Sequence, residues 1–332
     1  MTFLVTGAAG LLGRHVVDLL VQDGEHPRAL VRPGESLGGL DREAVDVRVA
    51  DVRDRQGLRE ALEGVHDVLH CAAKTGPWGP EREYVSTNVV ALEDLIRLAQ
   101  RAGARRVVHV SSITVHGNDV RGMADEDAPL VTEPNPYSRS KVAGERLVRR
   151  LVDREGAPVT VVRPGWIYGP RDVASFGRFA QMIEAGSMVM IGSGANHVPL
   201  VYVRDAARGV IQAARADSAR GGTYLLVNDE PVTQREYLHA IAQALEVPPP
   251  GRRIPYRLAL ATGAVAEAAA RWAHRSQPPP VTRYGIQLLG GENRFDVGRA
   301  RRDLGFAPQV PMVEGVREAV AWYRATQMVP AG

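Results

Sequence analysis

Tyr137 and Lys141 are four residues apart in a stretch that predicts a long helix beginning near Pro136. Residues i and i+4 lie on one face of a helix, so the phenol and the ammonium group point the same way. A cation about 4 Å from a phenol, at an effective dielectric of about 20, favours the ionised form by about 4 kcal/mol, or about three pKa units. The pair therefore predicts a tyrosine that can exchange a proton with a hydroxyl or carbonyl group.

Two other polar residues are candidates for the same site. Ser112 follows a predicted strand over residues 106–110, where its hydroxyl could orient a substrate oxygen. Asn88 lies in a helix predicted over residues 83–102 and could hold Lys141 through a water molecule. Lysine occurs only as Lys74 and Lys141, and every other cation is arginine, so both lysines are expected where a compact ammonium group is required.

The first thirteen residues predict a cofactor site. Residues 2–5 predict a buried strand, and glycines at positions 7, 10 and 13 follow before an apolar helix. Glycine lets the backbone approach a phosphate, and a helix N-terminus offers free N–H groups and a partial positive charge. The spacing is one residue longer than the usual Rossmann fingerprint, but its context predicts a dinucleotide-binding turn. We expect cofactor contacts from Gly7, Ala9, Gly10, Leu11, Leu12 and Gly13.

Strands and helices alternate through the first half of the chain. Further strands are predicted over residues 27–31, 45–50, 68–73 and 159–163, which indicates a doubly wound parallel α/β sheet of the Rossmann type. We expect residues 1–170 to form the dinucleotide-binding domain. Residues 171–332 are expected to form mainly a smaller, mixed substrate lobe, with some segments returning to the first domain. In that half, helices are predicted near 173–185, 204–216, 233–246 and 313–323, and strands near 198–202 and 223–227.

Arg32 ends the second predicted strand, where the choice between NAD and NADP is usually made. An acidic residue there binds the ribose hydroxyls of NAD, whereas arginine suits the 2′-phosphate of NADP. Arg32 therefore predicts NADP, with NAD as the alternative. Asp51 ends the third strand and could accept a hydrogen bond from the adenine amino group. Additional cofactor contacts are expected from Val52, Ala72, Ala73, Lys74, Ser111, Tyr137 and Lys141.

Composition argues against several other classes of protein. The 41 basic and 38 acidic residues are dispersed, so nucleic acid is not an expected partner. The single cysteine, Cys71, cannot form an internal disulfide, and the nine histidines show no metal-ligand spacing. The histidine spacing leads us to expect no bound metal. No apolar stretch is long enough to span a membrane and no signal peptide is predicted, so we expect a cytoplasmic protein.

The chain resembles the extended short-chain dehydrogenase/reductases over nearly its whole length. Within them it is most similar to the 3β-hydroxysteroid dehydrogenase branch and its bacterial sterol and keto-acid reductase relatives. The resemblance rests on residues 72–79, 110–112, 163–170, 201–205 and 295–301. It implies catalysis by Tyr137, Lys141 and Ser112 with Asn88 in support, and contacts of Pro164 and Ile167 with the nicotinamide end. Relatives commonly pair through the helices that hold Asn88 and Tyr137, which implies a homodimer.

Two departures from the wider superfamily narrow the expected substrate. Nucleotide-sugar dehydratases place an Asp-Glu pair where this chain has Ile113 and Thr114, and nucleotide-sugar enzymes tend to carry a diphosphate-binding arginine where residues 196–200 hold none. We expect an oxidoreductase that interconverts a secondary alcohol and a ketone on a small apolar substrate, sterol-like or a long-chain keto acid. The alternatives are a nucleotide-sugar epimerase and a non-catalytic NADP-binding regulator. Candidate substrate contacts are Lys74, Trp78, Thr114, Tyr168, Arg171 and His197.

Residues 258–273 predict a helix that is apolar nearly all round, with three consecutive prolines before it and three after it. Such a helix is buried, membrane-associated or in contact with an apolar ligand. We predict that it walls the substrate pocket, with full burial in the core as the alternative.

Overall fold

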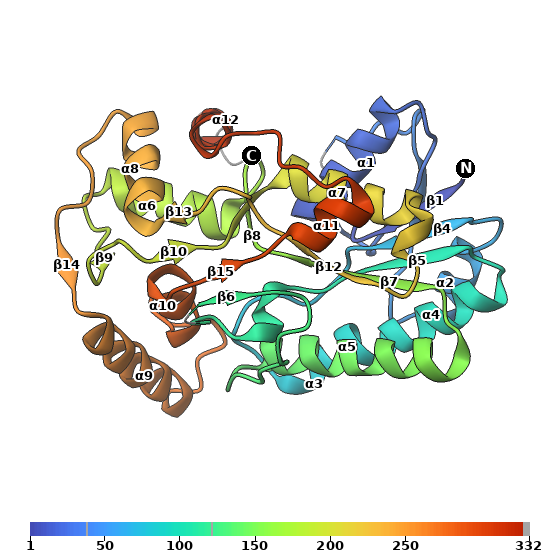
Figure 1. The fold of residues 1–332 in the computed structure, drawn as a ribbon, viewed down its shortest axis with the longest axis horizontal. Helices are drawn as coiled ribbons and strands as arrows, with labels where there is room; N and C mark the ends of the chain where they lie inside the picture. Colours follow the sequence, from blue (N-terminus) through green and yellow to red (C-terminus); the bar gives the residue numbers. More distant parts are fainter. Residues whose placement is uncertain (38, 121, 328–332) are drawn as a thin grey trace.

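A single seven-stranded sheet forms the centre of the computed structural model, which describes residues 1–37, 39–120 and 122–327. Every neighbouring pair of its strands is parallel, in the order β12-β7-β5-β4-β1-β2-β3 (Figure 1). The predicted parallel Rossmann-type sheet is therefore confirmed. The strands are β1 (Phe3–Thr6), β2 (Arg28–Val31), β3 (Asp46–Val49), β4 (Asp67–His70), β5 (Arg106–Val110), β7 (Val159–Pro164) and β12 (Thr223–Leu226).

Helices cover both faces of the sheet. On one face, α1 (Leu11–Gln22) packs against α7 (Val203–Arg215), because Val16 and Leu20 of α1 share a buried apolar cluster with Val210 of α7. On the other face, Leu58, Leu92 and Leu147 belong to a second cluster. They come from α2 (Arg55–Ala61), α4 (Ala91–Arg101) and α5 (Pro136–Glu155). Figure 1 shows α1 and α7 above the sheet and α4 and α5 below it.

The chain returns to this sheet after residue 170. β12 pairs with β7, with Leu226 opposite Pro164, so the seventh strand comes from the second half of the sequence. Helix α7 and the short helix α11 (Gly298–Leu304) cover the same part of the sheet, and Phe306, which follows α11, is buried in the cluster of α1 and α7. Residues 328–332 of the predicted lobe lie outside the described residues.

The remainder of the second half forms a helical lobe around its own apolar cluster. Tyr168, Tyr202 and Tyr237 are fully buried in it and meet at near-perpendicular ring angles. Its helical segments are η3 (Val173–Gly177), α6 (Arg178–Glu184), α8 (Gln234–Leu245), α9 (Tyr256–Trp272), α10 (Arg283–Gly290) and α12 (Met312–Gln327), while a short turn, η4 (Asp217–Ala219), follows α7. Eight short strands complete the described fold: β6 (Met123–Ala124), β8 (Trp166–Tyr168), β9 (Met190–Ile191), β10 (His197–Val198), β11 (Leu200–Tyr202), β13 (Val232–Thr233), β14 (Arg253–Ile254) and β15 (Arg294–Phe295).

Helix α9 is not buried in the core. Val265 is 70% exposed and Trp272 86% exposed, and the helix packs mainly against α10. The expectation of full burial is therefore wrong, because only one narrow side of the helix meets the rest of the protein. No helix among the described residues is long and apolar enough to cross a membrane.

Candidate active site

A cavity of about 800 Å³ runs along the carboxyl ends of the sheet strands. Because the strands are parallel, the residues that follow them meet at the same edge of the sheet. Gly7 follows β1, Arg32 follows β2 and Ser111 follows β5, and all three line this cavity. The lobe contributes the wall from Arg171 to Ala174. The predicted cofactor residues that line the cavity are Gly7, Gly10, Leu11, Leu12, Gly13, Arg32, Asp51, Val52, Ala72, Ala73, Lys74, Ser111, Tyr137, Lys141, Pro164 and Ile167.

The glycine turn at one end of the cavity fits a dinucleotide phosphate. Gly7 has a φ of +64°, and a Cβ there would lie 2.8 Å from the backbone of Ala72. A Cβ on Gly13 would lie 2.2 Å from the carbonyl oxygen of Gly7. Helix α1 begins after Gly10 without a side-chain cap and without an acidic residue in its first turn, so its positive N-terminus is available to an anion. Ala9 lies in the same turn, but it packs partly against the core and does not line the cavity.

Two arginines surround the cavity where the second and third strands end. The Arg32 guanidinium lies 3.0 Å from the carboxylate of Glu35, and its side chain is 67% exposed. Arg53 binds Asp51 with two side-chain hydrogen bonds of 2.7 and 2.8 Å, and this contact lowers the pKa of Asp51. All four residues line the cavity. Arg53 and Glu35 were not predicted. The sequence does contain a signal for Arg53, because this residue is only two positions from Asp51.

The candidate catalytic residues converge at the opposite end of the cavity. Tyr137 is 8% exposed and Lys141 is 3% exposed, both on α5. The ammonium group of Lys141 donates a 2.8 Å hydrogen bond to the carbonyl oxygen of Val110 at the end of β5 and lies 6.0 Å from the centre of the Tyr137 ring. The hydroxyl of Ser112 interacts with the Tyr137 phenol and opposes the rise in its pKa that burial causes, so strand and helix meet at the place that the spacing predicts.

The acidity of this pair differs from the prediction. Burial raises the pKa of Tyr137, and the nearby Ser112 side chain only partly opposes that effect. Burial also lowers the pKa of Lys141 to about 8, while the charge of Glu145 raises it. The prediction of a phenol made acidic by its lysine is therefore wrong for the protein alone, because desolvation acts on both groups. Tyr137 is a protonated phenol in this arrangement.

Asn88 makes direct contacts that were not predicted, while its water-mediated contact with Lys141 stays a prediction. Its side chain lies in the π-helical turn η1 (Ser86–Val90), between α3 (Glu81–Val85) and α4. Its amide accepts a 2.8 Å hydrogen bond from the backbone of Lys74 and donates to the carbonyl of Lys74 at 2.9 Å and to Ser140 at 2.8 Å. Ser140 in turn donates to the carbonyl of Tyr137 at 2.8 Å. Asn88 thus joins the loop after β4 to the catalytic helix.

A buried ion pair lies behind Lys141. Glu145 is one turn further along α5 from Lys141 and pairs with Arg163 of β7 at 2.6 Å, and each side chain is 6% exposed. Ser111 donates a 2.5 Å hydrogen bond to Glu145. Arg163 also contacts His116 at 2.9 Å, and burial lowers the pKa of that imidazole to about 4. These bonds fix the ends of β5 and β7 relative to α5.

A second phenol reaches the site from the far end of the sequence. The ring of Tyr284, on α10, meets the ring of Tyr137 edge to face at 6.3 Å. Burial raises the pKa of Tyr284, and the side chain of Thr114 partly opposes that effect. Thr114 follows the catalytic serine by two residues in the 3₁₀ turn η2 (Ile113–His116) and also donates to Asn118 at 3.1 Å. Tyr284 was not predicted, because nothing in its local sequence connects it with residue 137.

Four predicted substrate residues lie outside the cavity lining, and Thr114, described above, is one of them. Trp78 donates to the carbonyl of Arg275 at 3.1 Å and lies beside Arg271, so it attaches a loop to the end of α9. His197 is 2.7 Å from Glu292 on the lobe. Tyr168 is fully buried in the tyrosine cluster and offers no surface to a substrate, which corrects that prediction.

Lys74 and Arg171, the other two predicted substrate contacts, do line the cavity. Lys74 pairs with Glu83 at 2.6 Å, and Arg171 has a positive φ of 75° at the junction of sheet and lobe. None of the residues that line the cavity comes from α9. The prediction that this helix walls the pocket is corrected accordingly: α10 is the layer beside Tyr137, and α9 packs behind it.

Two further observations restrict the chemistry that the candidate site can perform. Burial raises the pKa of Cys71 to about 12, so this cavity-lining thiol stays protonated. The described residues contain no group of three or more His, Cys, Asp or Glu that could hold a metal.

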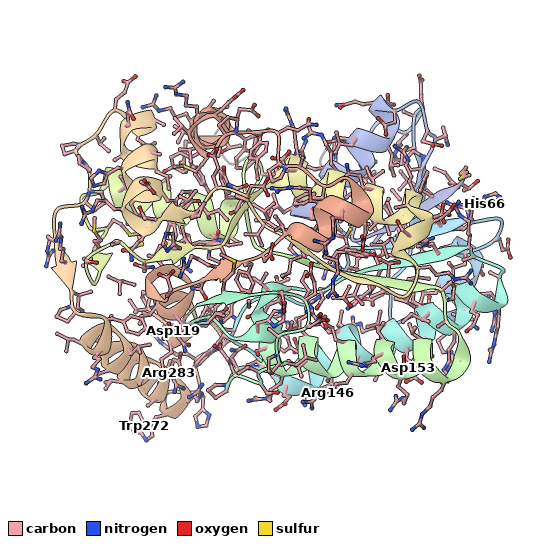
Figure 2. The ribbon with its side chains drawn as sticks, viewed as in Figure 1. His66, Asp119, Arg146, Asp153, Trp272 and Arg283 are labelled. Atoms are coloured by element: carbon pink, nitrogen blue, oxygen red, sulfur yellow. The ribbon has the colours of Figure 1, made fainter. Side chains whose placement is uncertain are left out.

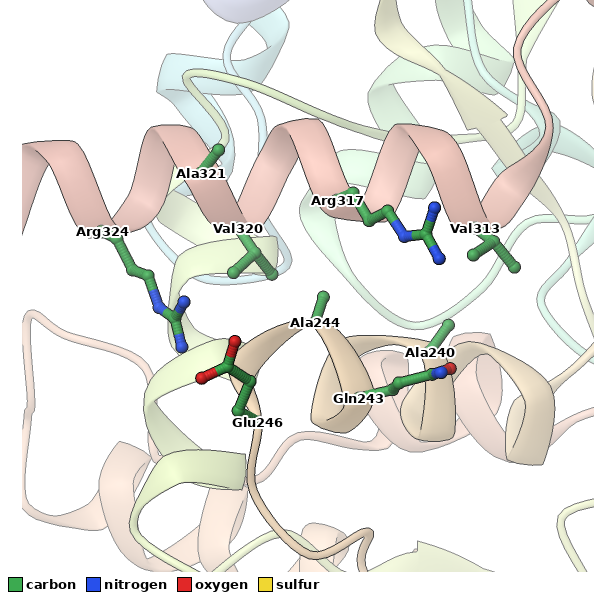
Figure 3. Close-up of a pocket in the computed structure, with 9 residues that line it drawn as sticks. All are labelled: Ala240, Gln243, Ala244, Glu246, Val313, Arg317, Val320, Ala321 and Arg324. Carbon is green, nitrogen blue, oxygen red and sulfur yellow. The ribbon is translucent and has the colours of Figure 1, made fainter.

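A smaller cavity of about 330 Å³ lies between α8 and α12, and Figure 3 shows Arg317 and Arg324 on one side of it, opposite Gln243 and Glu246. None of the candidate catalytic or cofactor residues lines it.

Known proteins share both this sequence pattern and this fold. The sequence matches the NAD dependent epimerase/dehydratase family over residues 3–226. Sterol demethylase protein B of Methylococcus capsulatus is 34% identical over 334 residues, covering 99% of this chain and 100% of that protein. The 2-alkyl-3-oxoalkanoate reductase of Stenotrophomonas maltophilia is 30% identical over 332 residues, covering 97% and 99%. The crystal structure of gox2253 has a TM-score of 0.83 at 27% identity, covering 98% of each chain.

Proposed function

The chain belongs to the NAD-dependent epimerase/dehydratase family, as an extended short-chain NAD(P)-dependent oxidoreductase of CH–OH groups, and we propose that it reduces a ketone on an apolar substrate. The observation that carries this proposal is the convergence of Tyr137, Lys141 and Ser112 on the cavity that the cofactor residues also line. A phenol that keeps its proton is suited to donate it to a carbonyl oxygen.

The residues at the reaction end have distinct proposed roles. Ser112 orients the substrate oxygen, and Tyr137 gives that oxygen its proton as the alcohol forms. Lys141 binds the nicotinamide ribose through its ammonium group and maintains a positive charge beside the phenol. Asn88 acts as a positioning residue through Ser140 and Lys74. When bound, the nicotinamide supplies the hydride in reduction and accepts it in the reverse reaction.

Several features support an apolar substrate. Thr114 stands where dehydratases carry an acid, and its hydroxyl is engaged by Tyr284 and Asn118. His197, the residue that could have replaced the missing diphosphate arginine, is paired with Glu292. The names of two relatives, a sterol demethylase protein and a 2-alkyl-3-oxoalkanoate reductase, agree with a sterol-like or long-chain keto-acid substrate.

The family name supports a nicotinamide dinucleotide, and we further propose a preference for NADPH. Arg32 and Arg53 both line the cavity where a 2′-phosphate would lie beyond the second and third strands. Glu35 is the competing feature, because its carboxylate pairs with Arg32 and could bind ribose hydroxyls instead. A phosphate that replaces Glu35 as the partner of Arg32 would favour NADPH.

The direct test is turnover with a panel of ketones. Purified protein is mixed with NADPH and a steroid ketone or a long-chain 2-alkyl-3-keto acid, and consumption of NADPH is followed by absorbance. A UDP-sugar is incubated separately with the oxidised cofactor, NAD⁺ or NADP⁺, and the sugar products are analysed. We expect consumption with one or both apolar ketones. Epimerisation of the UDP-sugar without net cofactor consumption would instead identify a nucleotide-sugar epimerase. Cofactor binding without turnover of any substrate would favour a regulator.

The homodimer remains a proposal based on the family resemblance. Val85 and Val90, on α3 and η1, are exposed apolar residues on the helices that would pair. Sedimentation of the protein tests this proposal, and we expect the mass of two chains.

A further inference from the structure

Helix α9 has two sides of opposite character. Its buried residues are Ala259, Gly263, Glu267 and Ala270. Leu258, Ala261, Val265, Ala268 and Trp272 are all exposed, and their spacing of three and four residues places them in one stripe along the helix. We call this set the outer stripe. A helix in a soluble protein normally turns such an apolar stripe towards the core, whereas α9 turns it away.

The inner side of α9 is firmly attached, so the exposure of the outer stripe does not result from a loose helix. Gly263 lets α10 approach closely, since a Cβ there would lie 2.7 Å from the side chain of Ile286. Glu267 accepts hydrogen bonds of 2.8, 3.0 and 2.8 Å from the backbone and guanidinium of Arg283. Figure 2 shows Arg283 between α9 and the body of the protein and Trp272 at the outward end of the helix.

The segment of the chain that contains α9 is strongly basic, although the carboxylate of Asp119 contacts Tyr256 at the start of the helix. Residues 252–291 contain six arginines and one acidic residue, and the acid is Glu267, whose carboxylate is already paired with Arg271 and Arg283. Arg252, Arg253, Arg257 and Arg275 are exposed and have no ion pair to any residue that the structure describes. A helix with an apolar face that contains tryptophan, bordered by arginines, is suited to lie at a membrane surface rich in anionic lipids.

We propose that α9 docks the protein on an anionic lipid surface, with the outer stripe in the headgroup region and the surrounding arginines on lipid phosphates. The helix lies along the surface and does not cross the bilayer. Docking would place α10, and through it the Tyr284–Tyr137 contact, one layer from the lipid. An apolar substrate dissolved in that lipid would then reach the active site without crossing water. This last step rests on the proposed function, whereas docking itself does not.

Vesicle flotation with the full chain tests the proposal. The probes are vesicles of equimolar phosphatidylcholine and phosphatidylglycerol, and vesicles of phosphatidylcholine alone. We expect binding to the anionic vesicles that is at least tenfold stronger than to the neutral ones and that weakens as salt is raised. Failure to bind anionic vesicles, or equal binding to both types, would overturn the proposal.

Matched variants test whether vesicle binding depends on the outer stripe or is nonspecific. Val265→Ser and Trp272→Ser should each weaken vesicle binding several-fold, whereas Val49→Ser should not, although Val49 is also an exposed valine at 62%. Arg257→Gln should weaken binding and Arg149→Gln on α5 should not. All of these residues are exposed, and unchanged thermal unfolding would confirm that the variants fold. Equal effects of test and control variants would overturn the assignment to α9.

The competing occupant of the outer stripe is a second copy of this chain, because the same spacing suits the pairing of two helices. Sedimentation of wild type and Val265→Ser decides between them. A loss of mass in the variant, with unchanged vesicle binding, would overturn the lipid proposal. Since flotation involves no turnover, an enzyme that reduces apolar ketones but ignores vesicles would refute docking alone. A protein that docks without turnover would refute only the proposed function.

Discussion

The two ends of the large cavity are built in opposite ways. At the end of β2 and β3, each arginine pairs with an acid two or three residues away in sequence, and Arg32 is mostly exposed. At the end of β5, the bonds join residues far apart in the chain, and Tyr137 and Lys141 are buried. Exposed local pairs can exchange partners at little cost, whereas buried pairs between elements cannot. We therefore expect substitutions at the first end to change the preference for NADPH or NADH. Substitutions at the second end should strongly reduce stability or turnover.

The largest effect should come from breaking the buried ion pair behind the lysine. Glu145→Gln leaves the Arg163 guanidinium buried without its carboxylate, which should lower the free energy of unfolding by about 3 to 5 kcal/mol. Urea unfolding followed by circular dichroism measures this loss. The matched control is Glu155→Gln, which removes the exposed partner of Arg97 and should change stability little. Equal losses in the two variants would contradict the contrast between buried and exposed pairs.

Tyr137→Phe tests the proton donor itself. The variant keeps the ring and its packing but removes the hydroxyl, so kcat on an identified ketone should fall by about 10²-fold or more while cofactor binding survives. Tyr284→Phe provides the control, since it removes the neighbouring phenol and should keep most of the turnover. Lys141→Arg should also fail, because a planar guanidinium does not replace a compact ammonium group. Near-normal turnover of Tyr137→Phe would exclude the proposed mechanism.

The buried end should also respond to pH, unlike the arginines at the other end. The pKa of Lys141 is lowered to about 8, so kcat/KM should fall above that pH, by about tenfold per pH unit, as the lysine loses its charge. Stability should change in the opposite direction. Between pH 8 and the ordinary pKa of lysine, the unfolded chain binds a proton that the folded chain has released, so this group's contribution to stability rises with pH.

A pH–rate profile and urea unfolding at several pH values measure both trends. Lys141→Met should remove the rise in stability over that pH range, since it has no proton to lose. A wild-type rate that stays constant well above pH 8 would show that a charged lysine is not required.

The smallest effect belongs to the exposed end. Arg32→Asp should reduce the preference for NADPH over NADH by about tenfold. This corresponds to the low end of the free energy that a charge-assisted hydrogen bond contributes, because the Arg32 side chain is exposed. Calorimetric titration with both cofactors measures it. Arg48→Asp, an exposed arginine on β3 that does not line the cavity, is the control and should leave the preference unchanged. Stronger binding of NADH by the wild type would refute the NADPH proposal.

Local patterns were sufficient for the parts of the site that depend on neighbouring residues. The glycine turn, the strand ends and the Tyr137–Lys141 spacing each follow from a strand or helix that brings its own residues to the sheet edge. The parallel sheet followed from the alternation of strands and helices. The five helical regions predicted in the second half were also placed to within a few residues, because their apolar spacing is regular, whereas the short helices α10 and α11 were not predicted.

The contacts that sequence could not predict are those between distant segments. Tyr284 reaches Tyr137 across 147 positions of the chain, and the pairing of Asn88 with the backbone of Lys74 depends on how one loop folds over a helix. The raised pKa of Tyr137 has the same origin, since desolvation is set by everything packed around the phenol. Helix α9 was misjudged for a related reason: composition shows that a helix is apolar, but not which element covers it.

The pairing of β12 with β7 bears on how the protein is made. The seventh strand of the sheet and the helix that covers α1 both emerge from the ribosome after the first strands of the lobe. Until residue 215 has been synthesised, the apolar face of α1 lacks α7, and until residue 226 has been synthesised, β7 presents an open edge; both surfaces are prone to wrong association. The nascent chain must therefore keep an incomplete sheet soluble while it adds the residues between β7 and β12.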